Sequence, residues 1–198
     1  MIWLIVALSL PVVAVLAVAA IGSLLPKEFA GRAEAVFPRP PEAVFAAIAD
    51  FERHPMSSTL ARKVERLAGE GARPAWRESL GSSTVEVRTV AEEPPRRVVR
   101  DLRDSVVPMA ARWSIELAPE GAAARTRVTV VQTGTVERGT AHVPFFRFIL
   151  HVLGGARKGP EAYLAFLAKD LGPAPADAPG LTGSAAAPPP PTSRSPPA

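Results

Sequence analysis

The stretch FPRPPEAVFAAIADFERHP, residues 37–55, decides how the rest of the sequence is interpreted. A strand-like run at residues 33–38 leads into it, and Pro40 and Pro41 follow. Proline suits the first turn of a helix, where its missing N–H removes no hydrogen bond. The next apolar residues recur at the spacing of one helical face, and they are Val44, Ala47, Ile48 and Phe51. The stretch therefore predicts a strand that turns into a short helix, whose apolar face packs against a sheet.

The residues after this helix predict an antiparallel sheet. Short β-like runs alternate with turn signals such as Gly81-Ser82-Ser83. In residues 111–117, apolar side chains alternate with polar ones, which is the pattern of a half-buried strand. No helical pattern intervenes between the runs, so neighbouring strands are expected to be antiparallel. The expected strands are residues 63–67, 75–80, 84–90, 97–103, 111–117 and 125–136.

Helical spacing returns over residues 143–171. The pairs Gly154-Gly155 and Gly159-Pro160 interrupt it, so we expect either one bent helix or two segments in line. Gly172, directly after the pattern, is typical of a helix end. The apolar residues that set the spacing are Phe146, Ile149, Leu150, Leu153, Leu164, Leu167 and Leu171.

Residues 2–25 contain no charged side chain and predict a transmembrane helix, with residues 1–26 as a single-pass membrane anchor. Such a helix would extend roughly 36 Å, enough for a hydrocarbon core of about 30 Å. The flanking cations Lys27, Arg32 and Arg39 all follow the run, which favours a cytoplasmic domain. The alternative is a signal peptide cleaved after Ala19, with export of the domain.

The last segment, residues 172–198, is rich in Pro, Ala, Gly and Ser. It is predicted to be a disordered tail, because it has too few large apolar residues to offset the entropy cost of ordering. Residues 29–171, between anchor and tail, are long enough to form one domain with its own core.

Composition excludes several kinds of site. The chain has no cysteine, which excludes disulfides, thiolate metal sites and a cysteine nucleophile. Its net charge is +4, but the arginines are scattered among acidic residues, so no nucleic-acid partner is expected. The three histidines, His54, His142 and His151, form no metal-ligand pattern. No phosphate loop or dinucleotide fingerprint occurs, and we expect no metal and no cofactor.

The order of strand, short helix, about six antiparallel strands and long C-terminal helix resembles the SRPBCC superfamily. That superfamily includes START-type lipid-binding domains and polyketide cyclase/dehydrase-like proteins. The resemblance covers roughly residues 30–171 and rests on the opening stretch, RWSIEL (112–117), TRVTVVQTGTV (126–136) and PFFRFILHVL with YLAFLAKDLG (144–153 and 163–172). It implies an α+β helix-grip fold, in which a curved antiparallel sheet of about six to seven strands surrounds the long last helix.

A sheet curved around a helix leaves an interior that is mostly apolar with a few polar groups, and such interiors bind ligands. The alternative is that the same side chains simply fill a closed core. The candidate ligand-binding residues are Trp76, Glu78, Trp113, Ile115, Gln132, Phe146, Ile149 and Leu153.

The leading interpretation is a membrane-anchored module that binds a hydrophobic small molecule or lipid, with that molecule and the bilayer as its partners. The alternatives are a cyclase- or hydratase-type enzyme acting on an apolar substrate, and a ligand-free scaffold or co-chaperone-like domain. Acid–base catalysis by Glu78, Asp101 or His142 would favour an enzyme. Pairing of such a carboxylate with a neighbouring arginine would favour binding, and the available arginines are Arg88, Arg100 and Arg103.

Overall fold

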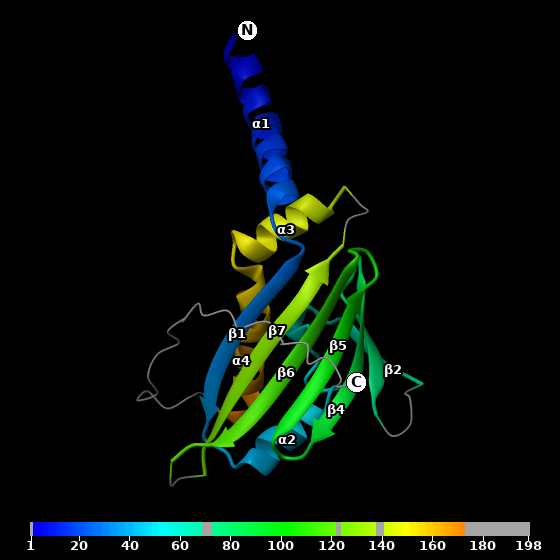
Figure 1. The fold of residues 1–198 in the computed structure, drawn as a ribbon, viewed down its shortest axis with the longest axis vertical. Helices are drawn as coiled ribbons and strands as arrows, with labels where there is room; N and C mark the ends of the chain where they lie inside the picture. The colour runs from blue at the N-terminus through cyan, green and yellow to red at the C-terminus, as the bar shows by residue number, and fades with distance from the viewer. Residues whose placement is uncertain (1, 69–72, 122–123, 138–140, 173–198) are drawn as a thin grey trace, which may run out of the picture.

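The computed structural model describes residues 2–68, 73–121, 124–137 and 141–172 (Figure 1). Apart from Gly172, the predicted tail lies outside the described residues. Seven strands form one antiparallel sheet in the order β1-β7-β6-β5-β4-β3-β2. Their bounds are β1 (Glu28–Phe37), β2 (Lys63–Leu67), β3 (Ala75–Ser79), β4 (Thr84–Glu93), β5 (Arg97–Asp104), β6 (Met109–Pro119) and β7 (Thr126–Val136).

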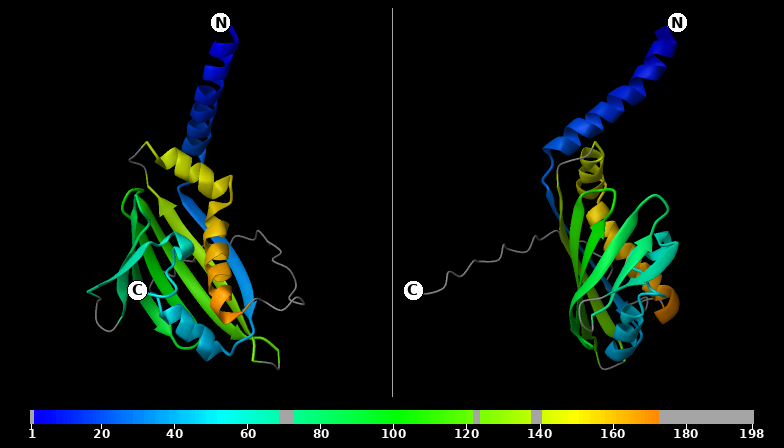
Figure 2. Two further views of the ribbon diagram at one scale, coloured as in Figure 1. Left: turned by 180° about the vertical axis from the view of Figure 1, so that it is seen from behind. Right: turned by 90° about the vertical axis from the view of Figure 1, so that its right-hand side faces the viewer.

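The helices lie on one face of this sheet and at its two ends. They are α1 (Ile2–Leu24), α2 (Pro41–Ala49), the 3₁₀ turn η1 (Ser58–Leu60), α3 (Val143–His151) and α4 (Gly155–Leu171). The curved sheet wraps around α4, while α2 covers the end of the sheet opposite to α1 (Figure 2). The α+β class, the antiparallel sheet and its grip on the last helix confirm the predicted helix-grip architecture.

The 37–55 stretch folds as its pattern predicts. Helix α2 begins at Pro41, directly after Pro40 in an extended conformation. Val44 and Ile48 are fully buried, and the Phe51 ring stacks on Trp76 with 4.3 Å between ring centroids. The apolar face of this helix therefore packs into the core, as expected.

The C-terminal helical region departs from the expectation of segments in line. Gly154 adopts the left-handed conformation, with φ of 69°, which glycine reaches at little steric cost. The chain turns there, so α3 lies across the end of the sheet while α4 runs along its concave face (Figures 1 and 2). Pro160, a second expected interruption, lies inside α4.

Helix α4 lies unusually close to β1 because β1 carries a glycine at the crossing point. A Cβ atom on Gly31 would lie only 2.1 Å from the carbonyl oxygen of Ala156. Any larger residue would push the start of α4 away from the sheet. This contact fixes the height of α4 above the concave face.

Helix α1 leaves the domain at the end of the sheet where α3 lies (Figure 1). Its side chains are described from Leu10 onward. Within the described part of the chain, no helix is long and apolar enough to cross a membrane, so the transmembrane helix expected over residues 2–25 is not found there.

Candidate functional site

A row of polar side chains crosses the concave face of the sheet beneath α4. The strand register places Thr89 of β4 opposite Arg100, Arg100 opposite Trp113, and Trp113 opposite Gln132. Directly paired residues of antiparallel strands point to the same face. We call Thr89, Arg100, Trp113 and Gln132 the polar row; each is at most 7% exposed.

Each member of the polar row has a buried polar atom that finds no hydrogen-bond partner among the described residues. These atoms are Thr89 Oγ1, Arg100 Nε, Trp113 Nε1 and Gln132 Oε1. Buried polar groups in native proteins are nearly always hydrogen-bonded, and an unpaired one costs about 1–3 kcal/mol. A row of such atoms on adjacent strands therefore requires hydrogen-bond partners that the described side chains do not supply, such as buried water or a polar group of another molecule.

Tyr163 covers the polar row from α4. Its side chain is fully buried, and its ring meets the Trp113 ring edge-on at 5.8 Å. The Tyr163 hydroxyl lies close enough to the Arg100 guanidinium for a hydrogen bond between them to lower its pKa, but it has no partner of good hydrogen-bond geometry within the described structure. Burial raises the pKa of Tyr163, and the nearby Arg100 guanidinium opposes that rise. The phenol therefore stays neutral at ordinary pH and can donate a hydrogen bond.

Glu78 forms a different kind of buried polar group, because all its bonding is internal. The fully buried carboxylate accepts hydrogen bonds from the backbone N–H groups of Met56 and Ser57 and from the Trp76 indole, each at 2.7 Å. Pairing with a neighbouring arginine, one of the two alternatives for this carboxylate, is therefore wrong for Glu78. Its role is to hold the segment after the 37–55 stretch against the sheet.

Arg100 connects this structural cluster to the polar row. Its guanidinium donates to the carbonyl oxygen of Ile48 at 2.6 Å and to the Met56 sulfur at 3.1 Å, and it lies over the Trp76 ring at 4.9 Å. These contacts fix the C-terminal end of α2. The Nε atom of Arg100 takes no part in these contacts and has no described hydrogen-bond partner.

The structure brings together most, but not all, of the predicted ligand-binding residues. Trp76, Glu78, Trp113, Ile115 and Gln132 are buried on the concave face. Phe146 of α3 is half-buried against the core. Ile149 and Leu153 lie outside the interior, with exposed fractions of 44% and 51%, because the turn at Gly154 carries α3 off the concave face.

The remaining acid–base candidates do not join the site. Asp101 lies on the other face of the sheet, where it accepts two hydrogen bonds from Arg112 at 2.6 and 2.8 Å. His142 is exposed at the start of α3. Asp101 is thus paired with an arginine, which was one of the two alternatives for such a carboxylate. The partner is Arg112, and not one of the three arginines that the sequence suggested.

Sequence reasoning missed Tyr163 and Thr89 and considered Arg100 only as an ion-pair partner. The sequence does carry a signal for Arg100, because it lies two residues after Val98 and two residues before Leu102 on β5, and both of these side chains are buried. Strand alternation therefore points its side chain inward. Tyr163 gives no comparable signal, because its position depends on how α4 is rotated over the sheet.

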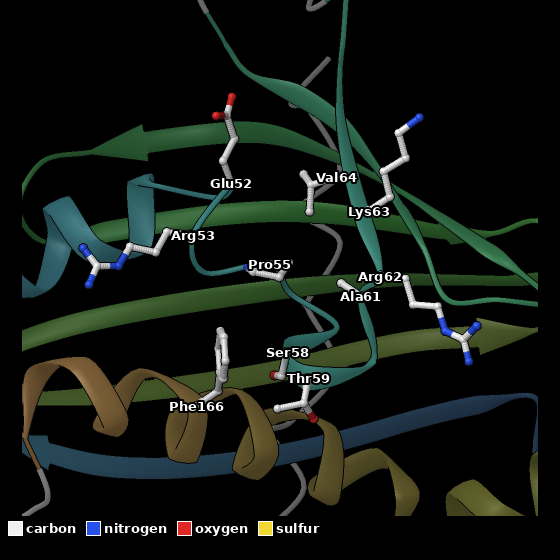
Figure 3. A pocket seen from close by; sticks show the side chains of 10 residues that line it. All are labelled: Glu52, Arg53, Pro55, Ser58, Thr59, Ala61, Arg62, Lys63, Val64 and Phe166. Carbon is white, nitrogen blue, oxygen red and sulfur yellow. The ribbon is translucent and has the colours of Figure 1, made fainter.

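A hollow of about 530 Å³ opens on the surface between α4 and the segment that Glu78 holds (Figure 3). The Phe166 ring rises from α4 beside η1 and forms one wall. Ser58 lines the other wall with φ of 52°, a left-handed conformation that residues other than glycine seldom adopt. The complete lining is Glu52, Arg53, Pro55, Ser58, Thr59, Ala61, Arg62, Lys63, Val64 and Phe166.

His54 ties the end of α4 to the end of the 37–55 stretch beside this hollow. Its Nε2 atom lies 2.9 Å from the Asp170 carboxylate, which also meets Arg53 at 2.8 Å. The hydrogen bond with His54 holds the pKa of Asp170 below its ordinary value; loss of solvent opposes this, and Arg53 adds to it. Arg53, the other partner of Asp170, lines the hollow.

A curved antiparallel sheet that grips a C-terminal helix over buried polar groups defines a helix-grip domain. A sequence model described as "Polyketide cyclase / dehydrase and lipid transport" matches residues 29–161. The chain belongs to this family, which confirms the resemblance to the SRPBCC superfamily. No sequence among curated proteins matches the chain.

Solved structures share the fold at low sequence identity. The Zhui aromatase/cyclase from Streptomyces sp. R1128 is 14% identical, with a TM-score of 0.60 over 73% of this chain and 93% of that one. A START superfamily protein from Mycobacterium smegmatis is 14% identical, with a TM-score of 0.57 over 72% and 97%. The protein TTHA0849 from Thermus thermophilus is 20% identical, with a TM-score of 0.53 over 72% and 96%. These similarities establish the fold alone.

Proposed function

We propose that the domain binds an apolar small molecule or lipid that carries an oxygen-bearing polar group, between the sheet and α4. The observation that carries this proposal is the polar row with Tyr163 above it. Five buried polar atoms without described partners converge on one region of an otherwise apolar interior. The family's description includes lipid transport, which supports a hydrophobic ligand.

The chemistry of the row favours oxygen acceptors on the ligand. Arg100 Nε and Trp113 Nε1 can only donate, and the hydroxyls of Thr89 and Tyr163 can donate as well. Arg100 is permanently charged and makes its described hydrogen bonds to a carbonyl and a thioether. A carbonyl, hydroxyl or carboxylate oxygen would complete these donors, and a ligand hydroxyl could also donate to the acceptor Gln132 Oε1. The apolar neighbours would contact the ligand's hydrocarbon body.

The surface hollow beside Phe166 is the proposed opening to this interior. Phe166 lies three residues after Tyr163 on α4, and residues at that spacing are neighbours on a helix. A ligand that entered there would pass between η1 and α4. One wall of this path is the segment that contains Met56 and Ser57, which Glu78 holds in place.

We further propose that the N-terminal segment, whose side chains are described only from Leu10 onward, anchors the domain in a membrane, with the domain on the cytoplasmic side. The support is the uncharged run of residues 2–25, together with the cations that follow it. From Leu10 onward, α1 exposes large apolar side chains along its length, including Val12, Val13, Val15 and Leu16. Only residues 25–27 separate α1 from β1, so the domain would stay next to the bilayer.

A cyclase-type enzyme is the second candidate, and the juxtaposition of Tyr163 and Arg100 favours it. A neutral phenol and a guanidinium that both donate to one carbonyl oxygen would stabilise negative charge developing on it. One of the structures with the same fold is an aromatase/cyclase. Glu78 is not available as the base, because its carboxylate is occupied by three N–H donors.

Photo-crosslinking tests the binding proposal. The full chain in nanodiscs would be irradiated with a photoactivatable fatty acid or sterol, and the crosslinked residues mapped by mass spectrometry. Crosslinks are expected on β5–β7 and α4, and Gln132→Leu should reduce them several-fold. Thr133→Leu is the matched control, because the adjacent side chain is exposed on the opposite face. Equal labelling of both variants, or labelling confined to the outer surface, would refute an interior site.

A further inference from the structure

We infer that the outer face of α3 lies on the surface of a lipid bilayer and holds the domain in a fixed orientation. This face consists of Ile149 and of Val152 and Leu153, which directly follow the helix. Their exposed fractions are 44%, 52% and 51%. The inference rests on the proposed anchor and adds a second membrane contact.

The polarity of α3 is inverted relative to a helix that faces water. Its sequence is VPFFRFILH, and Arg147 is its only residue that carries a permanent charge. Arg147 is 3% exposed, whereas Ile149 is exposed. A helix on the surface of a water-soluble domain normally does the reverse and turns its charged side chain outward.

Arg147 is buried because it fastens three segments together. Its guanidinium donates to the carbonyl oxygen of Val136 at 2.7 Å and to that of Leu25 at 3.4 Å. These contacts join α3 to the end of β7 and to the chain just after α1. The orientation of α3 relative to α1 is therefore set by a buried charged group.

A close approach between α1 and α3 makes the junction rigid. A Cβ atom on Gly22 would lie 1.8 Å from the carbonyl oxygen of Pro144, so only glycine permits this contact. Helix α3 consequently lies across the base of α1, as Figures 1 and 2 show. If α1 crosses a bilayer, α3 is held roughly parallel to its surface.

Other exposed apolar side chains gather at the same end of the sheet. Ile21 and Leu24 of α1 are exposed, and so is Val106 in the turn between β5 and β6. The register Met109 opposite Val136 places that turn at the end from which α3 starts. Exposed Lys158 follows α3 and suits anionic headgroups, whereas Arg157 is ion-paired with Glu161. A bilayer that already receives α1 is the occupant that fits this arrangement.

Depth-dependent quenching tests the inference on the full chain in liposomes. The chain has no cysteine, so single cysteines report without background. An environment-sensitive fluorophore would be placed by Ile149→Cys, Val152→Cys, Val13→Cys and Ala118→Cys, and quenched by spin-labelled lipids. Ala118 is exposed and lies nine residues along β6 from Met109, about 30 Å away at the other end of the sheet.

The expected result is quenching at positions 149 and 152 several-fold greater than at position 118. Quenching at position 13 with none at 149 and 152 would overturn the inference and leave the anchor standing. An absence of quenching at all four positions would overturn both the inference about α3 and the proposed α1 anchor. A blue-shifted but unquenched fluorophore at 149 and 152 would show that a second copy of the chain covers α3, which also overturns the inference.

Discussion

The indole N–H of Trp76 donates a 2.7 Å hydrogen bond to the Glu78 carboxylate, and both side chains are fully buried. The same carboxylate holds the backbone of Met56 and Ser57. The two residues therefore join β3, which lies next to the edge strand β2, to the wall of the proposed opening. The wall keeps its strained Ser58 conformation because the preceding backbone is bound to the core.

Glu78→Gln tests this structural role. An amide offers one acceptor oxygen and turns an NH₂ donor toward N–H groups, so at least one buried donor loses its partner. We expect a loss of about 2–3 kcal/mol in the free energy of unfolding, measured by chemical denaturation. The control is Glu86→Gln, which removes a partly exposed ion pair with Arg77 and should cost under about 1 kcal/mol. Similar losses in the free energy of unfolding for both variants would contradict a special structural role for Glu78.

Tyr163→Phe separates stability from binding. The hydroxyl has no described partner, so removing it should leave stability unchanged or raise it by about 1 kcal/mol. The same change should reduce photo-crosslinking of an added fatty acid or sterol, because a ligand donor is lost. A clear loss of stability with unchanged crosslinking would instead assign the hydroxyl to the fold.

Tyr163 is the chain's single tyrosine, so its titration can be followed directly by ultraviolet absorbance. Burial raises its pKa above the ordinary value of 10.0, with Arg100 opposing the rise. The folded state therefore keeps its proton where the unfolded state loses it, so stability should fall as pH rises above about 10. We expect ionisation only at higher pH or together with unfolding. Titration near pH 10 in a folded chain would show that the phenol reaches solvent.

The α1 anchor predicts fractionation with membranes and resistance to carbonate extraction. The mature chain should retain Met1 or Ile2 at its N-terminus, measured by mass spectrometry of the intact protein. A chain that begins at Ala20 would contradict the anchor and favour cleavage and export.

The sequence predicted those parts of the fold that depend on local periodicity. Alternation in residues 111–117 placed Trp113 and Ile115 inward, and the i, i+4 spacing of Val44 and Ile48 placed α2 on the core. The direction of α3 could not be predicted, because the helical spacing continues past Gly154 while the backbone turns there. The spacing therefore predicts Ile149 in the interior, whereas the structure leaves it exposed.

The polar row was only partly predictable for a related reason. Trp113 and Gln132 were identified from strand patterns, and cross-strand register then brings Arg100 and Thr89 beside them. Register between distant strands is set by turns and packing, which a single sequence does not reveal. Tyr163 joins the row from α4, whose start approaches the sheet closely at Gly31.

Native mass spectrometry of the full chain, purified in detergent from its membranes, tests the central claim most directly. We predict a releasable adduct whose mass matches an apolar molecule with oxygen-bearing groups, present in the wild-type chain and in Thr133→Leu but depleted in Gln132→Leu and Tyr163→Phe. A wild-type chain that appears only at the mass of its polypeptide, and that takes up no added fatty acid or sterol, would contradict the binding site and favour a ligand-free scaffold.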